Sequence, residues 1–165
     1  MTEPTVIGRG EVTAADPARF SANKPSFFAD PLAWLVAAAI ERALDGAQVE
    51  PVMAGIVVMS DTAALPTSRV IAGEARRGRV SPLRFAGSNP GILAGLSCAR
   101  WGLRGPSLVL TGAFPKVSDT GFTVARRWLA DGHARHVVCA TYRTVPGGAH
   151  TADCVLLGSS DPGAT

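Results

Sequence analysis

Long apolar runs and aromatic residues are both scarce in this chain of 165 residues. No run approaches the roughly eighteen apolar residues that a membrane span needs, and the N-terminus lacks the basic and then apolar pattern of a secretory signal. Aromatic residues make up 6% of the chain, and most of the apolar residues are Ala, Val and Leu. We therefore expect a cytoplasmic protein with no membrane partner, in which helices pack closely on a sheet.

Cysteine, histidine and dense basic runs are also few. Cys98, Cys139 and Cys154 lie in apolar stretches without close pairing, which favours reduced, mostly buried thiols over a zinc site or a disulfide scaffold. The three histidines fit no standard metal spacing, so surface roles are expected for them. The net charge of +3 comes from scattered arginines without interleaved aromatic residues. These patterns predict no metal, no cofactor and no nucleic-acid partner.

Five segments have the character of strands. The first alternates apolar and polar residues, and the later ones are short apolar runs of the kind found in buried sheets. The expected strands are 5–13, 53–59, 107–112, 136–142 and 152–159. The last two are separated by a Pro-Gly-Gly turn and are close enough in sequence to pair in antiparallel fashion.

Four segments have helical character. The clearest begins with Asp30 as N-cap and Pro31 at the first helical position, and it ends at Gly46. Polar residues 66–77 form a second candidate, Asn89 and Pro90 open a third that ends at Gly102, and 118–129 form a fourth. The order βαβαβαββ predicts a single α/β domain over residues 1–165, with a mixed five-stranded sheet and helices on both faces.

Several of these segments resemble the N-terminal half of a β-ketoacyl synthase, an enzyme of the thiolase fold. The strongest match is 81–112, which contains the string Gly-Leu-Arg-Gly-Pro-Ser before a strand. The opening strand, segment 124–142 and the last strand are also similar to pieces of that half. The resemblance covers nearly the whole chain and implies a single thiolase-like half domain.

The turn after the third strand departs from the enzyme pattern. Ketosynthases place a nucleophilic cysteine there, and this sequence has Ala113 opposite it. Shifting the alignment by one residue places Gly112 or Phe114 there, and neither is a nucleophile. The two catalytic histidines of the family come from a second half that this sequence does not contain. The local Thr-Gly sequence is similar to chain length factors, the cysteine-less partners of ketosynthases in type II polyketide synthases.

The leading hypothesis is therefore a noncatalytic ketosynthase-like accessory subunit in polyketide or fatty-acyl chain biosynthesis. The resemblance implies a homodimer or a heteromer with a ketosynthase, because a lone half domain leaves an apolar surface exposed. In the family the contact runs along the third strand. The implied interface residues are Ser107, Leu108, Val109, Leu110 and Thr111.

Two other functions remain open. One is a small enzyme that acts on carrier-bound acyl chains with recruited groups, and the other is an acyl or carrier-protein binding module. The recruited groups would be Lys116, Ser118, Asp119 or Cys98, although Ser118 and Asp119 are more typical of a helix N-cap than of a triad. Contacts to a carrier protein or another anion would come from Lys116, Arg76, Arg77 and Arg79, in a region that also holds Arg69 and Arg84. Without such a partner, these arginines form a solvated face.

Overall fold

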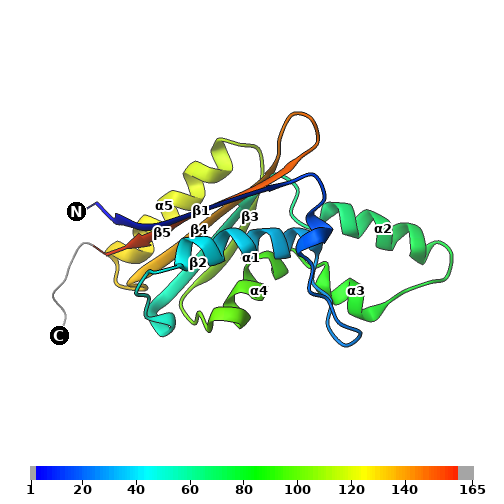
Figure 1. Ribbon diagram of the computed structural model, residues 1–165, viewed down its shortest axis with the longest axis horizontal. Helices are drawn as coiled ribbons and strands as arrows, with labels where there is room; N and C mark the ends of the chain where they lie inside the picture. The colour runs from blue at the N-terminus through cyan, green and yellow to red at the C-terminus, as the bar shows by residue number, and fades with distance from the viewer. Residues whose placement is uncertain (1–2, 160–165) are drawn as a thin grey trace.

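The computed structural model describes residues 3–159, which form one mixed sheet flanked by helices (Figure 1). The strands are β1 (Thr5–Ala14), β2 (Ala54–Ser60), β3 (Ser107–Thr111), β4 (His136–Thr144) and β5 (His150–Gly158). Their order across the sheet is β1-β5-β4-β2-β3. β2 is parallel to both β3 and β4, and β5 is antiparallel to β4 and β1. The predicted mixed five-stranded α/β half domain is confirmed.

One face of the sheet is covered by α1 (Pro31–Leu44) and α4 (Ile92–Trp101). Asp30 begins α1 as predicted, because its carboxylate accepts a hydrogen bond of 2.8 Å from the amide of Leu32. The expected apolar face is buried in the main core. Its members are Leu32, Leu35, Val36, Ala39, Ile40 and Ala43.

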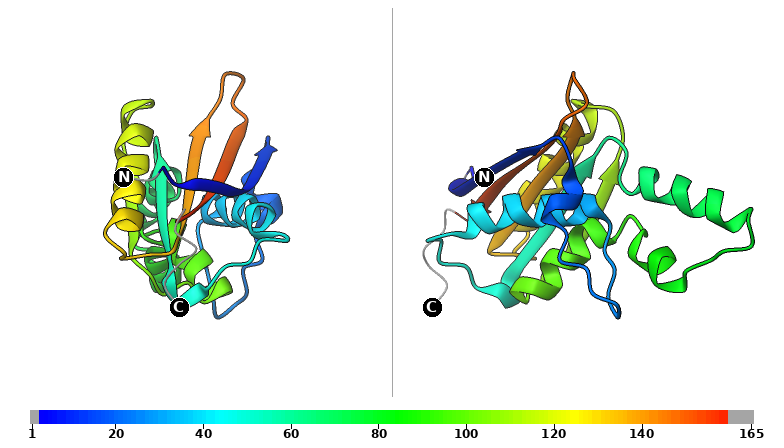
Figure 2. Two further views of the ribbon diagram at one scale, coloured as in Figure 1. Left: turned by 90° about the vertical axis from the view of Figure 1, so that its left-hand side faces the viewer. Right: turned by 45° about the vertical axis from the view of Figure 1, so that its right-hand side comes forward.

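The opposite face is covered by α5 (Lys116–Ala130), which Figure 2 shows standing on the other side of the sheet from α1. Val117, Ala125 and Leu129 bury against Val57 and the neighbouring strand residues in a second core cluster. Gly121 lies where the helix approaches β2, and a Cβ there would meet the Met59 sulfur at 2.1 Å. Helices on both faces are therefore confirmed.

Two helices leave the body of the molecule as an arm. α2 (Leu65–Ala75) follows β2, and α3 (Pro82–Gly87) returns beside it, so that the pair projects away from the sheet (Figures 1 and 2). We call residues 65–87 the arm. The sequence analysis predicted a helix at 66–77 but missed α3, whose six residues are too short to show helical periodicity.

Several boundaries differ from those predicted. α5 begins at Lys116, with Pro115 as N-cap residue, so Ser118 lies inside the first turn and the expected N-cap role is wrong. The Ser118 hydroxyl instead donates a hydrogen bond of 2.6 Å to the carbonyl of Pro115. β4 and β5 each extend two residues further toward their shared turn, to Thr144 and His150, because the ladder between them continues. No helix within residues 3–159 is long and apolar enough to cross a membrane.

Candidate functional site

The turn between β3 and α5 is the position at which the sequence analysis located a lost nucleophile. β3 ends at Thr111, and the amide of Gly112 still donates to the carbonyl of Ser60 at 2.9 Å, which extends the β2 ladder by one residue. Ala113 follows, and its carbonyl accepts from the amide of Val117 at 3.0 Å, which opens the helix. The turn therefore runs directly from a strand end into a helix N-terminus.

Ala113 is exposed at this turn, whereas Phe114 is half-buried against the second core cluster. A side chain at 113 is thus presented outside the core, and a methyl group there offers neither a nucleophile nor an acid or base. Lys116 is exposed at the first position of α5. Position 113 therefore carries no nucleophilic group, and the cationic side chain of Lys116 follows three residues later.

The three cysteines lie elsewhere. Cys139 and Cys154 are buried in adjacent strands, and burial raises the pKa of Cys139 to about 12 and moves the pKa of Cys154 higher still. Cys98 is half-buried on α4, and burial raises the pKa of its thiol, while a hydrogen bond from Ser107 opposes that shift. All three thiols stay protonated at neutral pH, which is unfavourable for a nucleophile.

The histidines do not converge on the turn. His133 is exposed, as expected. The surface role expected for His136 and His150 is wrong, because both side chains are half-buried. His136 is half-buried, and burial lowers the pKa of its imidazole. His150 lies across the ladder from Thr144, with Nδ1 2.7 Å from the hydroxyl of Tyr142 and its ring stacked on that side chain. The sequence analysis missed this pair, because only the strand register brings Tyr142 and His150 together.

No group of three or more His, Cys, Asp or Glu side chains within the described part of the chain is arranged to hold a metal ion. The Tyr142–His150 pair lies near another polar group, Asp61, whose carboxylate accepts from the amide of Thr144 at 3.0 Å. Burial raises the pKa of Tyr142, and the nearby Asp61 carboxylate raises it further. The Tyr142 hydroxyl therefore stays protonated at neutral pH, and it is hydrogen-bonded to His150 at the β4–β5 end.

β3 is an edge strand of the described sheet, since within residues 3–159 it pairs with β2 alone. Pro106 accepts from Ile56 and Gly112 donates to Ser60, so the residues that face β2 alternate and the backbone groups of Ser107, Val109 and Thr111 point outward. The two end residues of the strand are exposed, and Leu108, Val109 and Leu110 are half-buried. The predicted interface strand thus offers an open edge flanked by α4 and α5.

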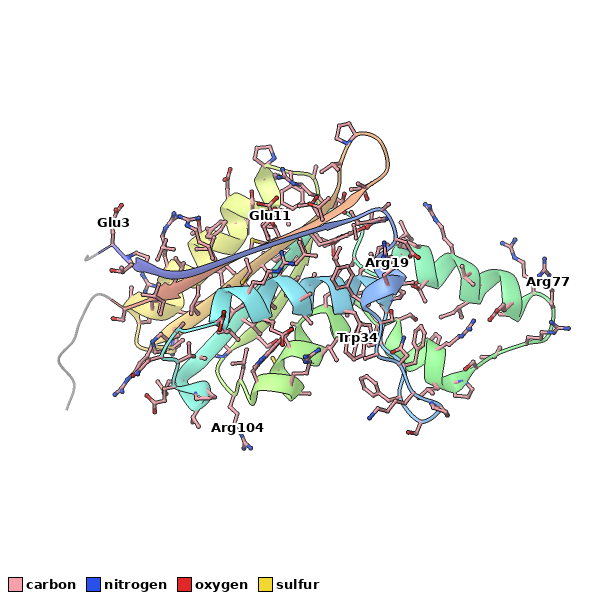
Figure 3. The ribbon with its side chains drawn as sticks, viewed as in Figure 1. Glu3, Glu11, Arg19, Trp34, Arg77 and Arg104 are labelled. Carbon is pink, nitrogen blue, oxygen red and sulfur yellow. The ribbon has the colours of Figure 1, made fainter. Side chains whose placement is uncertain are left out.

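The predicted anion contacts fall into two separate places. Lys116 lies at the start of α5, whereas Arg76, Arg77 and Arg79 lie at the tip of the arm, where Figure 3 labels Arg77. Because the arm projects away from the sheet and from α5, the structure does not bring the lysine and the arginines into one site (Figures 1 and 3). Ser118 and Asp119 lie near Lys116 on the first turn of α5, and within the described part of the chain their hydrogen-bond partners are Pro115 and Thr123 rather than a histidine.

The strand order, the strand-to-helix turn after β3 and the helices on both faces define a thiolase-like half domain. No family model and no curated protein matches the chain, so the similarity lies in the fold alone. The similarity to known proteins is therefore seen in solved structures.

The chain is similar to a structure described as the ishigamide ketosynthase/chain length factor, with a TM-score of 0.79 and 15% identity over 98% of this chain and 63% of that one. It is also similar to a ketosynthase (ApeO) in complex with its chain length factor (ApeC) from Xenorhabdus doucetiae, with a TM-score of 0.72 and 16% identity over 98% and 81% of the two chains. A third similar structure is a type II polyketide acyl-carrier protein in complex with its ketosynthase (AntDE:AntF). Its TM-score is 0.69 and its sequence identity is 13%, over 95% of this chain and 62% of that one. The chain thus spans less than two thirds of two of these chains.

Proposed function

We propose that this chain is a noncatalytic ketosynthase-like subunit in polyketide or fatty-acyl chain biosynthesis. The observation that carries the proposal is the exposed Ala113 at the strand-to-helix turn, where condensing enzymes of this fold need a nucleophile. The cysteines are displaced from that turn and carry raised pKa values, so none substitutes for the missing group. We also assign the chain, as one domain, to the cytoplasm, in keeping with its three free thiols.

The subunit acts by association, and the open edge of β3 is the contact that we assign to it. An unprotected edge strand is a template for pairing with another chain. The other edge strand, β1, has a register shift between Val6 and Gly8 and exposes the charged Arg9 and Glu11. A register shift and exposed charged side chains both hinder the pairing of an edge strand with another chain. β3 has neither a charged residue nor a bulge, so it is the better pairing edge.

The partner that we propose is a ketosynthase or a second copy of this chain. Two solved structures of this fold are described as a ketosynthase together with a chain length factor. An association of that kind would cover the half-buried Leu108, Val109 and Leu110. Lys116 and the arginines of the arm remain candidate contacts for a carrier protein in such an assembly.

The small-enzyme alternative is weaker on chemical grounds. The Ser118 hydroxyl already donates to the carbonyl of Pro115, and a nucleophilic serine needs a base to accept that proton. Asp119 is exposed and its backbone carbonyl holds the hydroxyl of Thr123 at 2.8 Å. A binding module without a partner synthase remains the second candidate, because Lys116 is exposed beside a helix N-terminus.

Light scattering of the purified chain, alone and after co-expression with neighbouring-gene ketosynthases, tests this function. We expect a stable mixed complex and no condensation by the isolated chain on acyl-carrier substrates. An Ala113→Cys variant serves as the matched control, because none of the three histidines converges on this turn to activate the cysteine, and the variant is expected to stay inactive. Condensation by the isolated wild-type chain contradicts the proposal, as does a chain that stays monomeric and binds none of the ketosynthases offered.

A further inference from the structure

The arm is the most exposed apolar part of the described chain. Within α2 and α3, Ile71 and Gly87 are the only buried residues. Val80 is 60% exposed and Phe85 is 67% exposed, which is far more than an apolar side chain has in a finished core. Leu65, Val70 and Leu83 are exposed on the same two helices and their connection. Five of the exposed large apolar side chains of the described residues thus gather on this one projection, which points to a contact with another molecule.

The arm is also strongly basic. It contains Arg69, Arg76, Arg77, Arg79 and Arg84, with Glu74 as its one acidic residue. The whole chain has a net charge of only +3, so the remainder of the molecule is close to neutral. Within residues 3–159 only Arg84 of these five has an ion pair, with Glu74 at 3.4 Å, and its guanidinium also lies over the ring of Phe28. The other four guanidinium groups are available to an acidic surface.

The base of the arm is held firmly, although its tip is not covered. Gly87 packs against the backbone of Phe28 so closely that a Cβ would lie 2.1 Å from the carbonyl oxygen. The carbonyl of Gly87 accepts a hydrogen bond of 2.9 Å from the amide of Asp30, just before α1 begins. At the other end, the hydroxyl of Ser60 accepts from Ala63 at 2.7 Å, which fixes the entry to α2. A firmly held arm presents its patch in one orientation and loses little entropy on binding.

Apolar and basic residues share the outward surface of the arm. Leu65 and Arg69 are four residues apart and lie on one side of α2, and both are exposed. A helix that lies on a membrane instead separates its apolar face from its basic face. Interleaved apolar and basic side chains suit a protein surface on which acidic groups surround apolar sockets.

We infer that the arm recognises a different protein chain with an acidic surface around an apolar socket, and that this chain is the partner subunit rather than a second copy. The inference rests on the proposed function and deepens it. Pairing of two such arms would bring guanidinium groups of like charge together and would cost affinity. The arm leaves β2 at Ser60, which is hydrogen-bonded to the end of β3, so one partner can contact both the β3 edge and the arm.

The test uses the full chain co-expressed with the ketosynthase that forms the mixed complex. Reversing Arg76, Arg77 and Arg79 together to Glu is expected to weaken the complex by at least about tenfold in Kd, because charged interfaces of this kind depend on complementarity. Phe85→Ser is expected to weaken it by a similar factor. The matched control reverses Arg9, Arg104 and Arg126, which give the same charge change outside the arm and form no ion pair within residues 3–159.

The results separate the two proposals. A wild-type complex that the control leaves intact and the arm variants weaken supports the arm as the recognition element, and its affinity should fall as salt rises. A wild-type complex that survives the arm variants overturns the inference while the proposed function stands. Absence of any complex with the wild-type chain overturns both. Binding of the arm to a carrier protein or to anionic phospholipid vesicles, with no effect on the ketosynthase complex, also overturns it, as does a homodimer that dissociates on charge reversal.

Discussion

Gly121 of α5 lies directly against Met59 of β2, and the glycine leaves room for the methionine sulfur at the centre of the second core cluster. An added Cβ would come within 2.1 Å of that sulfur and 2.5 Å of the methionine Cγ. Met59 is fully buried, so the sulfur has little freedom to move aside. The contact sets how closely α5 approaches the sheet and therefore where the turn at Ala113 lies.

Gly121→Ala is expected to destabilise the chain by about 1 to 3 kcal/mol, which is the usual cost of forcing an extra group into a packed core. Chemical denaturation followed by far-ultraviolet circular dichroism measures the change. Gly95→Ala on α4 is the matched control, because a Cβ there meets nothing within 4 Å and a mid-helix alanine is favoured over glycine by about 1 kcal/mol. Equal stability of the two variants would contradict the close approach of α5 to β2.

Asp30 caps α1 from a buried position, and its burial raises the pKa of its carboxyl group above the ordinary value. The folded chain therefore binds this proton more tightly than the unfolded chain, so Asp30 contributes a cost to stability that grows as pH rises through the folded pKa. Asp30→Asn keeps the cap without the charge and is expected to match or exceed the wild type at neutral pH. The two are expected to converge as pH falls and the carboxyl becomes protonated.

Asp30→Ala separates the cap from the charge. It removes the acceptor for the Leu32 amide, so we expect a loss of about 1 kcal/mol relative to Asp30→Asn at all pH values, because neither variant titrates at this position. Thermal unfolding of the three proteins over a pH series provides the measurement. A wild-type chain that gains stability relative to Asp30→Asn as pH rises would contradict the assigned direction.

We expect association through the β3 edge to depend on Val109, because its backbone groups point outward. Val109→Asp is expected to abolish the mixed complex and leave an aggregation-prone monomer, because the charge would lie within the contact. Val109→Thr is the matched control, since its shape is similar and it carries no charge. Val109→Pro removes the outward amide and tests the backbone contact separately. Light scattering gives the mass, and retention of the complex by Val109→Asp would show that β3 is not the interface.

Pattern alone predicted much of this fold. Asp30 and Pro31 predict the start of α1. The helical spacing of Leu32, Leu35 and Val36 predicts its buried face, because local chemistry determines caps and amphipathic faces. The buried strands could also be predicted from the sequence, because a short apolar run such as Ala54–Ser60 favours a parallel sheet. The site position followed from the resemblance at the turn near Ala113.

Features that depend on tertiary contacts could not be predicted from the sequence pattern. α3 is too short for periodicity, and Ser118 is a good cap residue that nonetheless lies inside a helix, because α5 begins two residues earlier. The Tyr142–His150 pair depends on strand register, and the exposed state of Phe85 depends on where a whole arm projects. Sequence composition does not report which apolar faces stay uncovered.

The cysteines give a prediction that links reactivity to assembly. Cys98 is half-buried beside the start of β3, whereas Cys139 and Cys154 are buried and have strongly raised pKa values. Iodoacetamide at mildly alkaline pH is therefore expected to modify Cys98 first and slowly, because its own raised pKa keeps the thiolate fraction low. The rate should rise with pH, and mass spectrometry of tryptic peptides measures it site by site.

The rate at Cys98 also reports on the interface. Its neighbour Ser107 is the first residue of β3, so a partner on that edge covers the approach to the thiol. We expect the mixed complex to slow modification of Cys98 relative to the isolated chain, with Cys98→Ser as the control that removes the signal. Modification of Cys139 ahead of Cys98 would contradict the packing of the sheet, and an unchanged rate at Cys98 in a verified complex would place the partner away from β3.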